Sequence, residues 1–269
     1  MPRTDDRELP VYAAGSVEVP YVIRGMLEPL DRDTRWGLHS HPTHELLWNE
    51  RGVSTATVGT RTWSITPRHG LWIPAGTLHT GSAPAGTWYR TAQFGPHAVP
   101  SIADAPVAVE VTPLLRLLLE RLDDPVLAPG SRSVTETMVL DVLAPAPHEL
   151  LVQVPEAPLL GRVVAAVLAD PGDRRTLGAW AAELGVSPRT LTRAFRQETG
   201  HGFTGWVASV RANRAMGLLM EGAEPGDVAA ATGYASVSAF GAAFRRVTGL
   251  TPGAVRDRPA PPTTTRTDG

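Results

Sequence analysis

Four side chains in the first third of the chain have the types and spacing of metal ligands. His39, His41 and Glu45 follow the pattern H-x-H-x3-E-x6-G, which ends at Gly52, and His79 closes a second pattern, P-x-G-x2-H. Imidazole and carboxylate groups together suit divalent zinc, iron, nickel, cobalt or manganese. Two histidines at alternate positions lie on one face of a strand, and His79 could join them from a neighbouring strand. The sequence therefore predicts a mononuclear site for a divalent transition metal, with a metal-free pocket lined by the same histidines as the alternative.

A second set of candidate residues lies in the last third of the chain, between Thr176 and Arg256. Two helical patterns there break at a glycine and restart: LGAWAAELG precedes VSPRTLTRAFRQETG, and PGDVAAATG precedes YASVSAFGAAFRRVTG. A helix, a short turn that opens on glycine and a second helix form the helix-turn-helix pattern. Two such units joined by one long helix predict a domain that binds double-stranded DNA.

The second helix of the first unit carries the predicted base-reading residues. Ser187 is expected to cap it and Pro188 to begin it, while Leu191 and Phe195 face the core. The outward side chains are then Arg189, Thr192, Arg193 and Arg196. We expect Arg189 and Arg193 to read bases together with Thr192, because arginine pairs with guanine in bidentate fashion. Arg196, one turn further along, is expected to contact phosphate.

The second unit offers weaker chemistry for reading bases. Its predicted DNA-contacting residues are Ser236, which also caps the helix, and Val237, Ser238, Gly241, Ala242, Arg245 and Arg246. Ser238 is the one that offers a direct hydrogen bond to a base, and Gly241 and Ala242 allow apolar contact with a thymine methyl group. Arg245 and Arg246 are expected to bind phosphate. We therefore predict that the first unit carries most of the sequence specificity.

The elements that must position these residues divide the chain into four parts. Short strand-like segments rich in β-branched and aromatic residues predict a cupin-like antiparallel β-barrel over residues 1–110. Helical periodicity over 112–122 and 131–143, followed by a proline-rich stretch, predicts a helical dimerisation or linker segment over 111–158. An all-α domain with two helix-turn-helix units follows over 159–258, and residues 259–269 are predicted to be disordered. The fold class is thus α+β with several domains.

Each helix of the segment between these domains is predicted to have one apolar stripe. Leu114, Leu115, Leu118 and Leu122 form the first stripe, and Val134, Met138 and Val142 form the second. The two helices could either cover the barrel or form the seam of a dimer. Thr112 is the expected N-cap of the first helix, with Pro113 at its first position.

Composition and charge narrow the function classes. The 269 residues include no cysteine, which excludes disulfides and thiolate zinc sites. No apolar run reaches the roughly 18 residues of a membrane span, so we expect a cytoplasmic protein without membrane contact. Residues 1–157 hold 12 Arg and 18 Asp or Glu, a net of −6, whereas residues 158–258 hold 12 Arg and 8 Asp or Glu, a net of +4. The excess of positive charge in the second part favours contact with a polyanion there.

These motifs carry a resemblance to known families. Residues 159–256 resemble the DNA-binding domain of the AraC/XylS transcription regulators, and the segment GYASVSAFGAAFRRVTGLTPGAVR at 233–256 is the most specific part. The resemblance places the family's base-reading positions on Arg189, Thr192, Arg193 and the outward residues of the second unit. The two histidine motifs resemble the cupin motifs of sensor domains that precede such DNA-binding domains, although Ala83 stands where an asparagine is usual.

The favoured function is a transcription regulator whose barrel senses a small molecule or a metal ion. Trp48 and Trp72 could line the pocket together with the histidines, and His44 and His69 are expected at the surface or beside the site. A homodimer is expected, with RNA polymerase as a further partner if the protein is an activator. The alternative is a metal-dependent cupin enzyme, an oxygenase or isomerase, fused to a DNA-binding module. A paired general acid and base beyond the four candidate ligands is not evident, so no catalytic residue is assigned.

Overall fold

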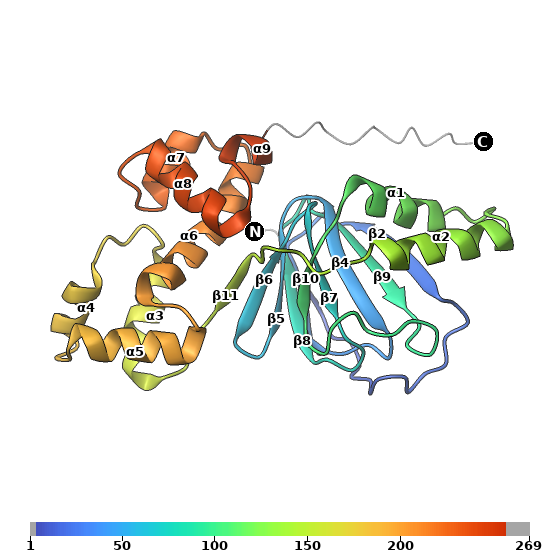
Figure 1. The fold of residues 1–269 in the computed structure, drawn as a ribbon, viewed down its shortest axis with the longest axis horizontal. Helices are drawn as coiled ribbons and strands as arrows, with labels where there is room; N and C mark the ends of the chain where they lie inside the picture. Colours follow the sequence, from blue (N-terminus) through green and yellow to red (C-terminus); the bar gives the residue numbers. More distant parts are fainter. Residues whose placement is uncertain (1–3, 257–269) are drawn as a thin grey trace.

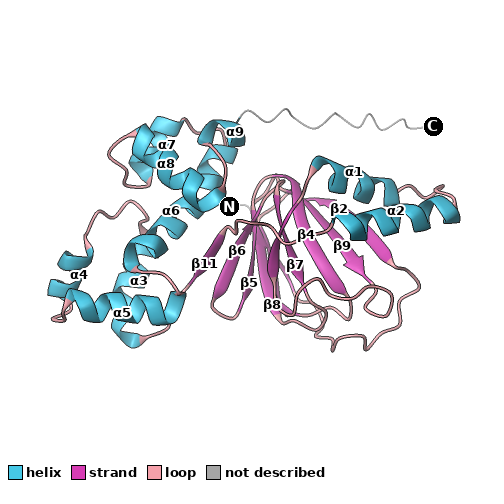
Figure 2. Cartoon of the chain, viewed as in Figure 1, coloured by secondary structure: helices cyan, strands magenta, loops and turns pink. Residues whose placement is uncertain are grey.

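A β-barrel and a helical domain make up the protein, as the fold class predicted (Figures 1 and 2). The computed structural model describes residues 4–256, so the predicted disordered tail lies outside the described residues. Within residues 4–256, no helix is both long and apolar enough to cross a lipid bilayer.

Two sheets form the barrel, and all their pairings are antiparallel except that of β1 with β3. The strands are β1 (Asp5–Arg7), β2 (Ile23–Pro29), β3 (Thr34–His39), β4 (His44–Arg51), β5 (Ser54–Val58), β6 (Arg61–Ile65), β7 (His69–Ile73), β8 (His79–Ala83), β9 (Trp88–Phe94), β10 (Val107–Glu110) and β11 (Leu151–Gln153). One sheet has the order β1-β3-β8-β5-β6-β11, and the other has the order β10-β7-β4-β9-β2.

Strand β4 shows why this sheet is buried on both faces. Successive side chains of a strand point to opposite faces. Leu47 therefore packs inside the barrel in a cluster with Trp63 and Ile65, whereas Leu46 and Trp48 pack on the outer face. The helices α1 (Pro113–Leu122) and α2 (Pro129–Val142) cover that outer face and share its core. The predicted N-cap of α1 is confirmed, because the Thr112 hydroxyl accepts a hydrogen bond from the Leu115 amide at 3.2 Å.

The predicted apolar stripes of the two helices need correction. In α1, Leu115, Leu118 and Leu122 are buried as expected, but Leu119 completes the stripe and Leu114 is exposed. In α2 the prediction is wrong for two of its three residues, whereas Val142 is partly buried against the shared core as expected. Val134 and Met138 are exposed, and the buried residues are Thr135, Glu136 and Val139. Spacing defines a stripe but not which stripe meets the barrel. The Thr135 hydroxyl is satisfied within the helix, since it donates to the Ser131 carbonyl at 2.8 Å, and this allows the residue to be buried.

The helical domain has two hydrophobic cores, one for each helix-turn-helix unit. Its helices are η1 (Pro158–Leu160), α3 (Gly161–Ala169), α4 (Leu177–Glu183), α5 (Pro188–Thr199), α6 (Phe203–Met220), α7 (Pro225–Ala231), α8 (Val237–Thr248) and α9 (Pro252–Arg256). The 18-residue helix α6 joins the cores, since Phe203 and Trp206 belong to the first and Met216 and Leu219 to the second. At a rise of 1.5 Å per residue it spans about 27 Å. This rigid connection fixes the spacing of the two units.

Local sequence signals set the boundaries of the two helices that follow the turns. Gly185 and Gly233 have positive φ values of 67° and 75° in the turns, where glycine is favoured because it lacks a Cβ. Gly233 has a second reason, since a Cβ there would lie 2.6 Å from the carbonyl oxygen of Gly172. Ser187 and Ser236 cap α5 and α8 by accepting hydrogen bonds from backbone amides at 3.1 and 3.2 Å. The predicted starts of both helices are therefore confirmed.

The segment predicted as a plain linker contains a strand. Residues 151–153 form β11, which pairs with β6 at the edge of the barrel. The amide of Ser64 also donates to the carbonyl of Leu150 at 2.8 Å. Figure 1 shows β11 between the barrel and the helical domain. A three-residue strand in a proline-rich stretch has no local pattern to reveal it, because its stability comes from the edge on which it docks.

Candidate metal centre and nucleic-acid interface

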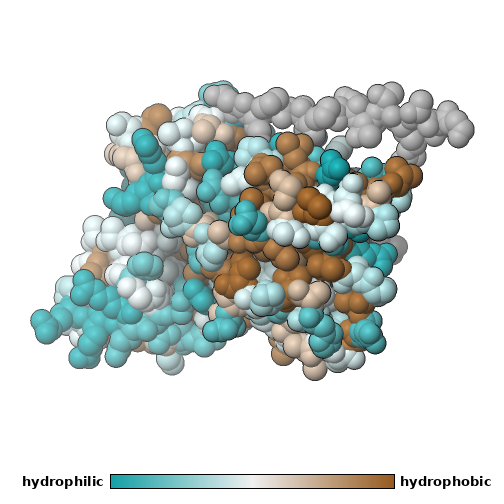
Figure 3. Space-filling model, turned by 45° about the vertical axis from the view of Figure 1, so that its right-hand side comes forward, coloured by the Kyte–Doolittle hydropathy of each residue, from teal (hydrophilic) through white to brown (hydrophobic). Residues whose placement is uncertain are grey.

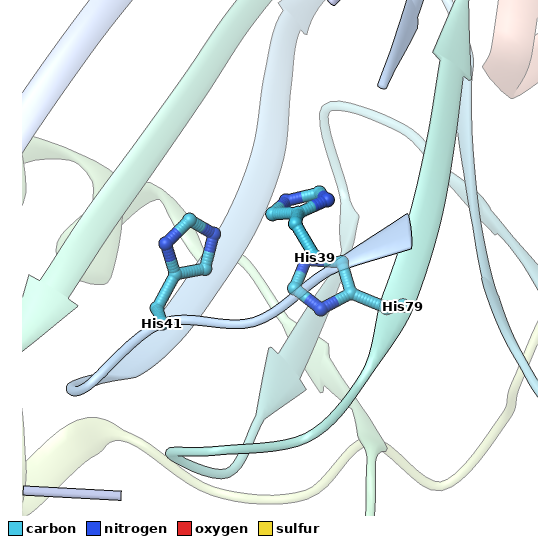
Figure 4. A group of neighbouring side chains, drawn as sticks. All are labelled: His39, His41 and His79. Atoms are coloured by element: carbon cyan, nitrogen blue, oxygen red, sulfur yellow. The ribbon is translucent and has the colours of Figure 1, made fainter. Parts of the chain in front are cut away.

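The first candidate site is a cluster of three imidazole rings at one end of the barrel (Figure 4). His39 ends β3 and His79 begins β8, and the two residues are direct cross-strand partners. His41 reaches the same place from the loop between β3 and β4. Ring centroids lie 4.2 Å apart for His39 and His79, 4.9 Å for His39 and His41, and 5.4 Å for His41 and His79. One nitrogen from each ring can be chosen so that all three lie within 4.8 Å of one another, a spacing that a single ion can bridge.

Glu45 places a carboxylate beside these rings from β4. It is buried, and its Oε1 accepts a 2.7 Å hydrogen bond from the side-chain amide of Gln93. Its Oε2 has no hydrogen-bond partner among residues 4–256. This oxygen lies 3.4 Å from Nε2 of His41 and 3.5 Å from Nε2 of His79, at the long limit for hydrogen bonds. A buried carboxylate oxygen without a short contact is costly, and it faces the three rings.

Backbone carbonyls fix the orientation of two of the rings. Nδ1 of His39 lies 2.7 Å from the carbonyl oxygen of Gly37, and Nδ1 of His79 lies 2.9 Å from that of Thr77. A carbonyl can only accept, so each Nδ1 carries the proton and each Nε2 keeps a free lone pair. Metal-binding histidines commonly donate their other N–H in this way.

The charges of the cluster are coupled. Burial would raise the pKa of Glu45, but the nearby Nε2 of His79 and the charges of the histidines outweigh it and lower that pKa. Burial would lower the pKa of His79, but the nearby carboxylate of Glu45 and the bond to the Thr77 carbonyl raise it. The pKa of His39 is lowered by burial, which outweighs its bond to Gly37. A carboxylate held ionised among imidazoles is the state that binds cations.

Trp48 and Trp72 do not line this site, contrary to the prediction. Both are fully buried on the outer face of their sheet, in the core shared with α1 and α2. Trp48 lies one residue after Leu47 and three after Glu45, and both odd offsets put it on the opposite side of β4. The residue that the prediction missed is Gln93, which faces Glu45 across β4 and β9. The hydroxyl of Thr43 donates to the carbonyl of this amide and so orients it. Strict alternation along the segment WYRTAQF could have indicated Gln93.

His44 and His69 are buried rather than at the surface. Nδ1 of His44 accepts the amide of Ala75 at 3.0 Å, and its ring stacks on Trp72 at 5.3 Å. His69 lies where the barrel meets the second helix-turn-helix unit, with the backbone of Thr248 as a hydrogen-bond partner. Burial lowers the pKa of His69 from 6.5 to about 4, with the charges of Arg68 and His148 acting in the same direction. Glu110 and the Thr248 carbonyl oppose the shift.

This shift of His69 predicts a loss of stability in mild acid. The unfolded chain takes up a proton near pH 6.5, whereas the folded protein resists it until about pH 4. Stability is therefore full above pH 6.5 and falls as the pH drops toward 4, by about 3 kcal/mol at most at 1.36 kcal/mol per pKa unit. Urea unfolding from pH 4 to 7 should show a steeper loss for the wild type than for His69→Gln, which keeps a donor but does not titrate. Parallel pH profiles for the two proteins would exclude this role of His69.

The outward face of α5 is the second candidate site. Arg189, Arg193 and Arg196 are exposed, and no salt bridge engages them within the described range 4–256. Leu191 and Phe195 are fully buried behind them. The hydroxyl of Thr192 donates to the carbonyl of Pro188 at 2.9 Å. It therefore keeps lone pairs for accepting a hydrogen bond and a methyl group for apolar contact, but its own proton is engaged.

The matching face of α8 is small and open. The exposed residues are Ser236, Val237, Ser238, Ala242, Arg245 and Arg246, and Gly241 is half-buried. A Cβ at Gly241 would meet no atom within 4 Å, so the helix surface there is free to approach another molecule closely. The Ser236 hydroxyl already accepts the amide of Ala239, which leaves its proton and one lone pair for an outside partner. The two faces differ in chemistry as the sequence suggested: one presents arginines at its N-terminal half, the other small side chains.

A sensor barrel joined to a double helix-turn-helix domain defines the class of one-component transcription regulators. Residues 26–139 match the model of the AraC-like ligand binding domain, and residues 180–258 match a helix-turn-helix domain model. The chain thus has the domain make-up of the AraC-type DNA-binding transcriptional regulators, with an N-terminal ligand-binding domain. Domains of this kind bind double-stranded DNA, and the ligand-binding domain implies a small-molecule effector.

The curated relatives are themselves named as transcriptional regulators. The HTH-type transcriptional regulator NimR of Escherichia coli is 27% identical over 220 residues, which is 80% of each chain. The regulator RipA of Corynebacterium glutamicum is 42% identical over 97 residues, 36% of this chain and 29% of that protein. Among solved structures, the C-terminal domain of AraT from Geobacillus stearothermophilus is 26% identical, with a TM-score of 0.37, and covers 42% of this chain and 95% of that chain. These matches give no support to the alternative of a cupin enzyme.

Proposed function

We propose that the barrel of this regulator senses a divalent transition metal ion at His39, His41, His79 and Glu45. The observation that carries the proposal is the buried Oε2 of Glu45, which faces three imidazoles and has no hydrogen-bond partner in the described range 4–256. Three neutral imidazoles and one carboxylate match the ligand preference of zinc, cobalt, nickel or iron. The fixed Nδ1 protons of His39 and His79 leave two Nε2 atoms ready to bind.

The donor set favours an ion over a larger organic effector at this place. The rings lie close together and are mostly buried, and apolar side chains including Leu47, Trp63 and Ile73 pack the barrel interior beside them. Trp48 and Trp72 lie on the other face of the sheet and so cannot stack on a planar ligand beside the histidines. A bound ion would replace the imperfect contacts of Glu45 by coordination.

Titration of the metal-free protein with cobalt or zinc tests this proposal. We expect one ion per chain, with a visible absorption spectrum for cobalt because the site supplies nitrogen and oxygen ligands. His79→Ala and Glu45→Gln should each weaken binding by more than about 100-fold, since even the loss of a residue that only supports a ligand costs 10–100-fold.

His97→Ala is the matched control, because His97 is exposed on the same domain and outside the cluster. Its affinity should equal that of the wild type. A wild-type protein that takes up no ion at micromolar concentrations, or a His79→Ala variant that binds as tightly as the wild type, would eliminate the site.

We further propose that α5 reads the operator with Arg189, Thr192 and Arg193, and that Arg196 contacts phosphate. The support is that the three arginines are exposed and Thr192 half-buried on one face, behind which Leu191 and Phe195 anchor the helix in the core. In the second unit, the predicted contacts of α8 add register and affinity through Ser238 and the phosphate-binding pair Arg245 and Arg246. The two helices would enter successive major grooves about 34 Å apart on one face of DNA.

The exposed face of α1 and α2 supports a homodimer. Leu114 and Leu117 of α1 and Val134 and Met138 of α2 are exposed apolar residues. Figure 3 shows that hydrophobic residues gather over the barrel half of the molecule, whereas the lower left of that view is hydrophilic. We propose that a second copy of the chain covers these four residues, that the protein acts in the cytoplasm, and that it contacts RNA polymerase where it activates transcription.

A further inference from the structure

Strand β11 connects the three hydrophobic cores that lie on either side of it. Leu151 packs against the barrel cluster that contains Trp63. Val152 belongs to the core of the first helix-turn-helix unit, and Leu150 to the core of the second. Alternation along an extended segment explains this arrangement, because Leu150 and Val152 point away from the barrel while Leu151 points toward it. A movement of β11 would therefore displace side chains in the cores of both DNA-binding units.

Hydrogen bonds tie β11 to the end of the helix proposed to read bases. The side-chain amide of Gln153 donates to the carbonyl of Glu198 at 2.6 Å. That carbonyl lies in the last turn of α5, where carbonyl groups have no partner within the helix. The indole N–H of Trp206 donates to the carbonyl of Gln153 at 2.8 Å, and the amide of Glu156 donates to the side chain of Glu198 at 3.1 Å.

The histidine cluster lies in the same sheet as β11. The sheet order β3-β8-β5-β6-β11 places the strands of His39 and His79 first and the strand of Gln153 last. Neighbouring strands are 4.7–4.9 Å apart, so the three steps from β8 to β11 span about 14 Å. Continuous backbone hydrogen bonds connect every step. A change in the spacing of His39 and His79 can thus be transmitted to α5 across three hydrogen-bonded strand pairs and β11.

We propose that Gln153 is the positioning residue through which the barrel sets the orientation of α5, so that occupancy of the histidine site changes DNA binding through β11. The effector half of this statement rests on the proposed metal site, whereas the anchoring of α5 by Gln153 does not. A ligand shifts DNA affinity only by as much as its own affinity differs between the two orientations. Gln153 lies on β11, outside both the histidine cluster and the outward faces of α5 and α8.

The test measures operator affinity of the full-length chain with and without zinc. Allosteric coupling commonly changes affinity about 5- to 150-fold, and we expect a ratio in this range for the wild type. Gln153→Leu has similar size but no donor, and its ratio should fall to within about twofold of one while its zinc affinity stays unchanged. Glu198→Gln is the control, because it keeps both the backbone carbonyl and a side-chain acceptor, and its ratio should match the wild type. A Gln153→Leu variant that retains the wild-type ratio overturns the proposal.

A second measurement separates this proposal from the metal site. Hydrogen exchange of residues 194–202 in metal-free protein should be faster in Gln153→Leu than in Glu198→Gln, because the last turn of α5 loses its anchor. Trp206→Phe, which removes the other side-chain bond to β11, should have the same effect. If wild-type protein binds no zinc, the proposed effector fails while faster exchange still supports the anchor. Unchanged exchange in both variants overturns the role of Gln153 even where zinc binds and acts.

Discussion

Replacing Arg193 with alanine should weaken operator binding about fivefold to more than a hundredfold. The side chain is exposed on α5, one turn from the N-terminal end that approaches base edges. Loss of a bidentate arginine–guanine pair costs about 1–3 kcal/mol, and 1.4 kcal/mol corresponds to tenfold. The fold should be intact, because Leu191 and Phe195 hold the helix in the core independently of Arg193. Gel-shift or fluorescence titration against the operator and its single-base variants measures the effect.

Arg162→Ala is the matched control for the loss of one positive charge. Arg162 is exposed on α3, where it pairs with Glu183 at 2.9 Å, so we expect less than a threefold change for it. The pattern across operator variants decides the role of Arg193. A base-reading residue loses discrimination at one position, whereas a phosphate contact weakens all sequences equally. Uniform weakening would move Arg193 to the phosphate-binding group, and an effect equal to that of Arg162→Ala would remove it from the interface.

Local signals in the sequence were sufficient for the helix-turn-helix units. Ser187 followed by Pro188 specifies the start of α5 through a cap and a fixed φ, and Gly185 specifies the turn before it. These effects act within four residues, so they can be read without knowledge of the fold. The histidine site was accessible for a similar reason. Residue type and spacing predicted that His39, His41 and His79 lie together, and in the structure they form one cluster.

Features that depend on partners distant in sequence could not be predicted. The periodicity of α2 was correct, but the barrel selects Val139 over Met138, and no residue of α2 itself encodes that choice. Trp48 and Glu45 lie on the same strand, β4, but on opposite faces of it. An error of one residue in the predicted register of a strand exchanges its two faces. The domain boundary at residue 159 stays a prediction. Residues 150 and 152, which precede that boundary, pack in the cores of the helical domain and so allow it to be tested.

A DNA-binding fragment that begins at residue 159 should be less stable than one that begins at residue 147 by about 3–5 kcal/mol. The shorter fragment, 159–258, lacks Leu150 and Val152, which are buried in the cores of the second and first units. Each buried aliphatic side chain contributes about 1.5–3 kcal/mol, and the lower half of the summed range applies because part of the surface is buried in the unfolded chain. The loss is a large share of the 5–15 kcal/mol typical of a domain. Urea unfolding of the two fragments, followed by tryptophan fluorescence, measures the difference.

Three substitutions within the longer fragment, 147–258, show which side of β11 matters. Leu150→Ala and Val152→Ala should each lower the free energy of unfolding, because both side chains pack on the helical domain. Leu151→Ala should leave it unchanged, since Leu151 packs on the barrel that the fragment lacks. Equal stability of the two fragments, or an equal cost for all three substitutions, would mean that β11 belongs to the barrel alone. The expected result, a cost for Leu150→Ala and Val152→Ala only, would instead make β11 a structural part of the DNA-binding domain that also pairs with the barrel sheet. In our proposal, a sensor in the barrel acts on α5 through this shared strand.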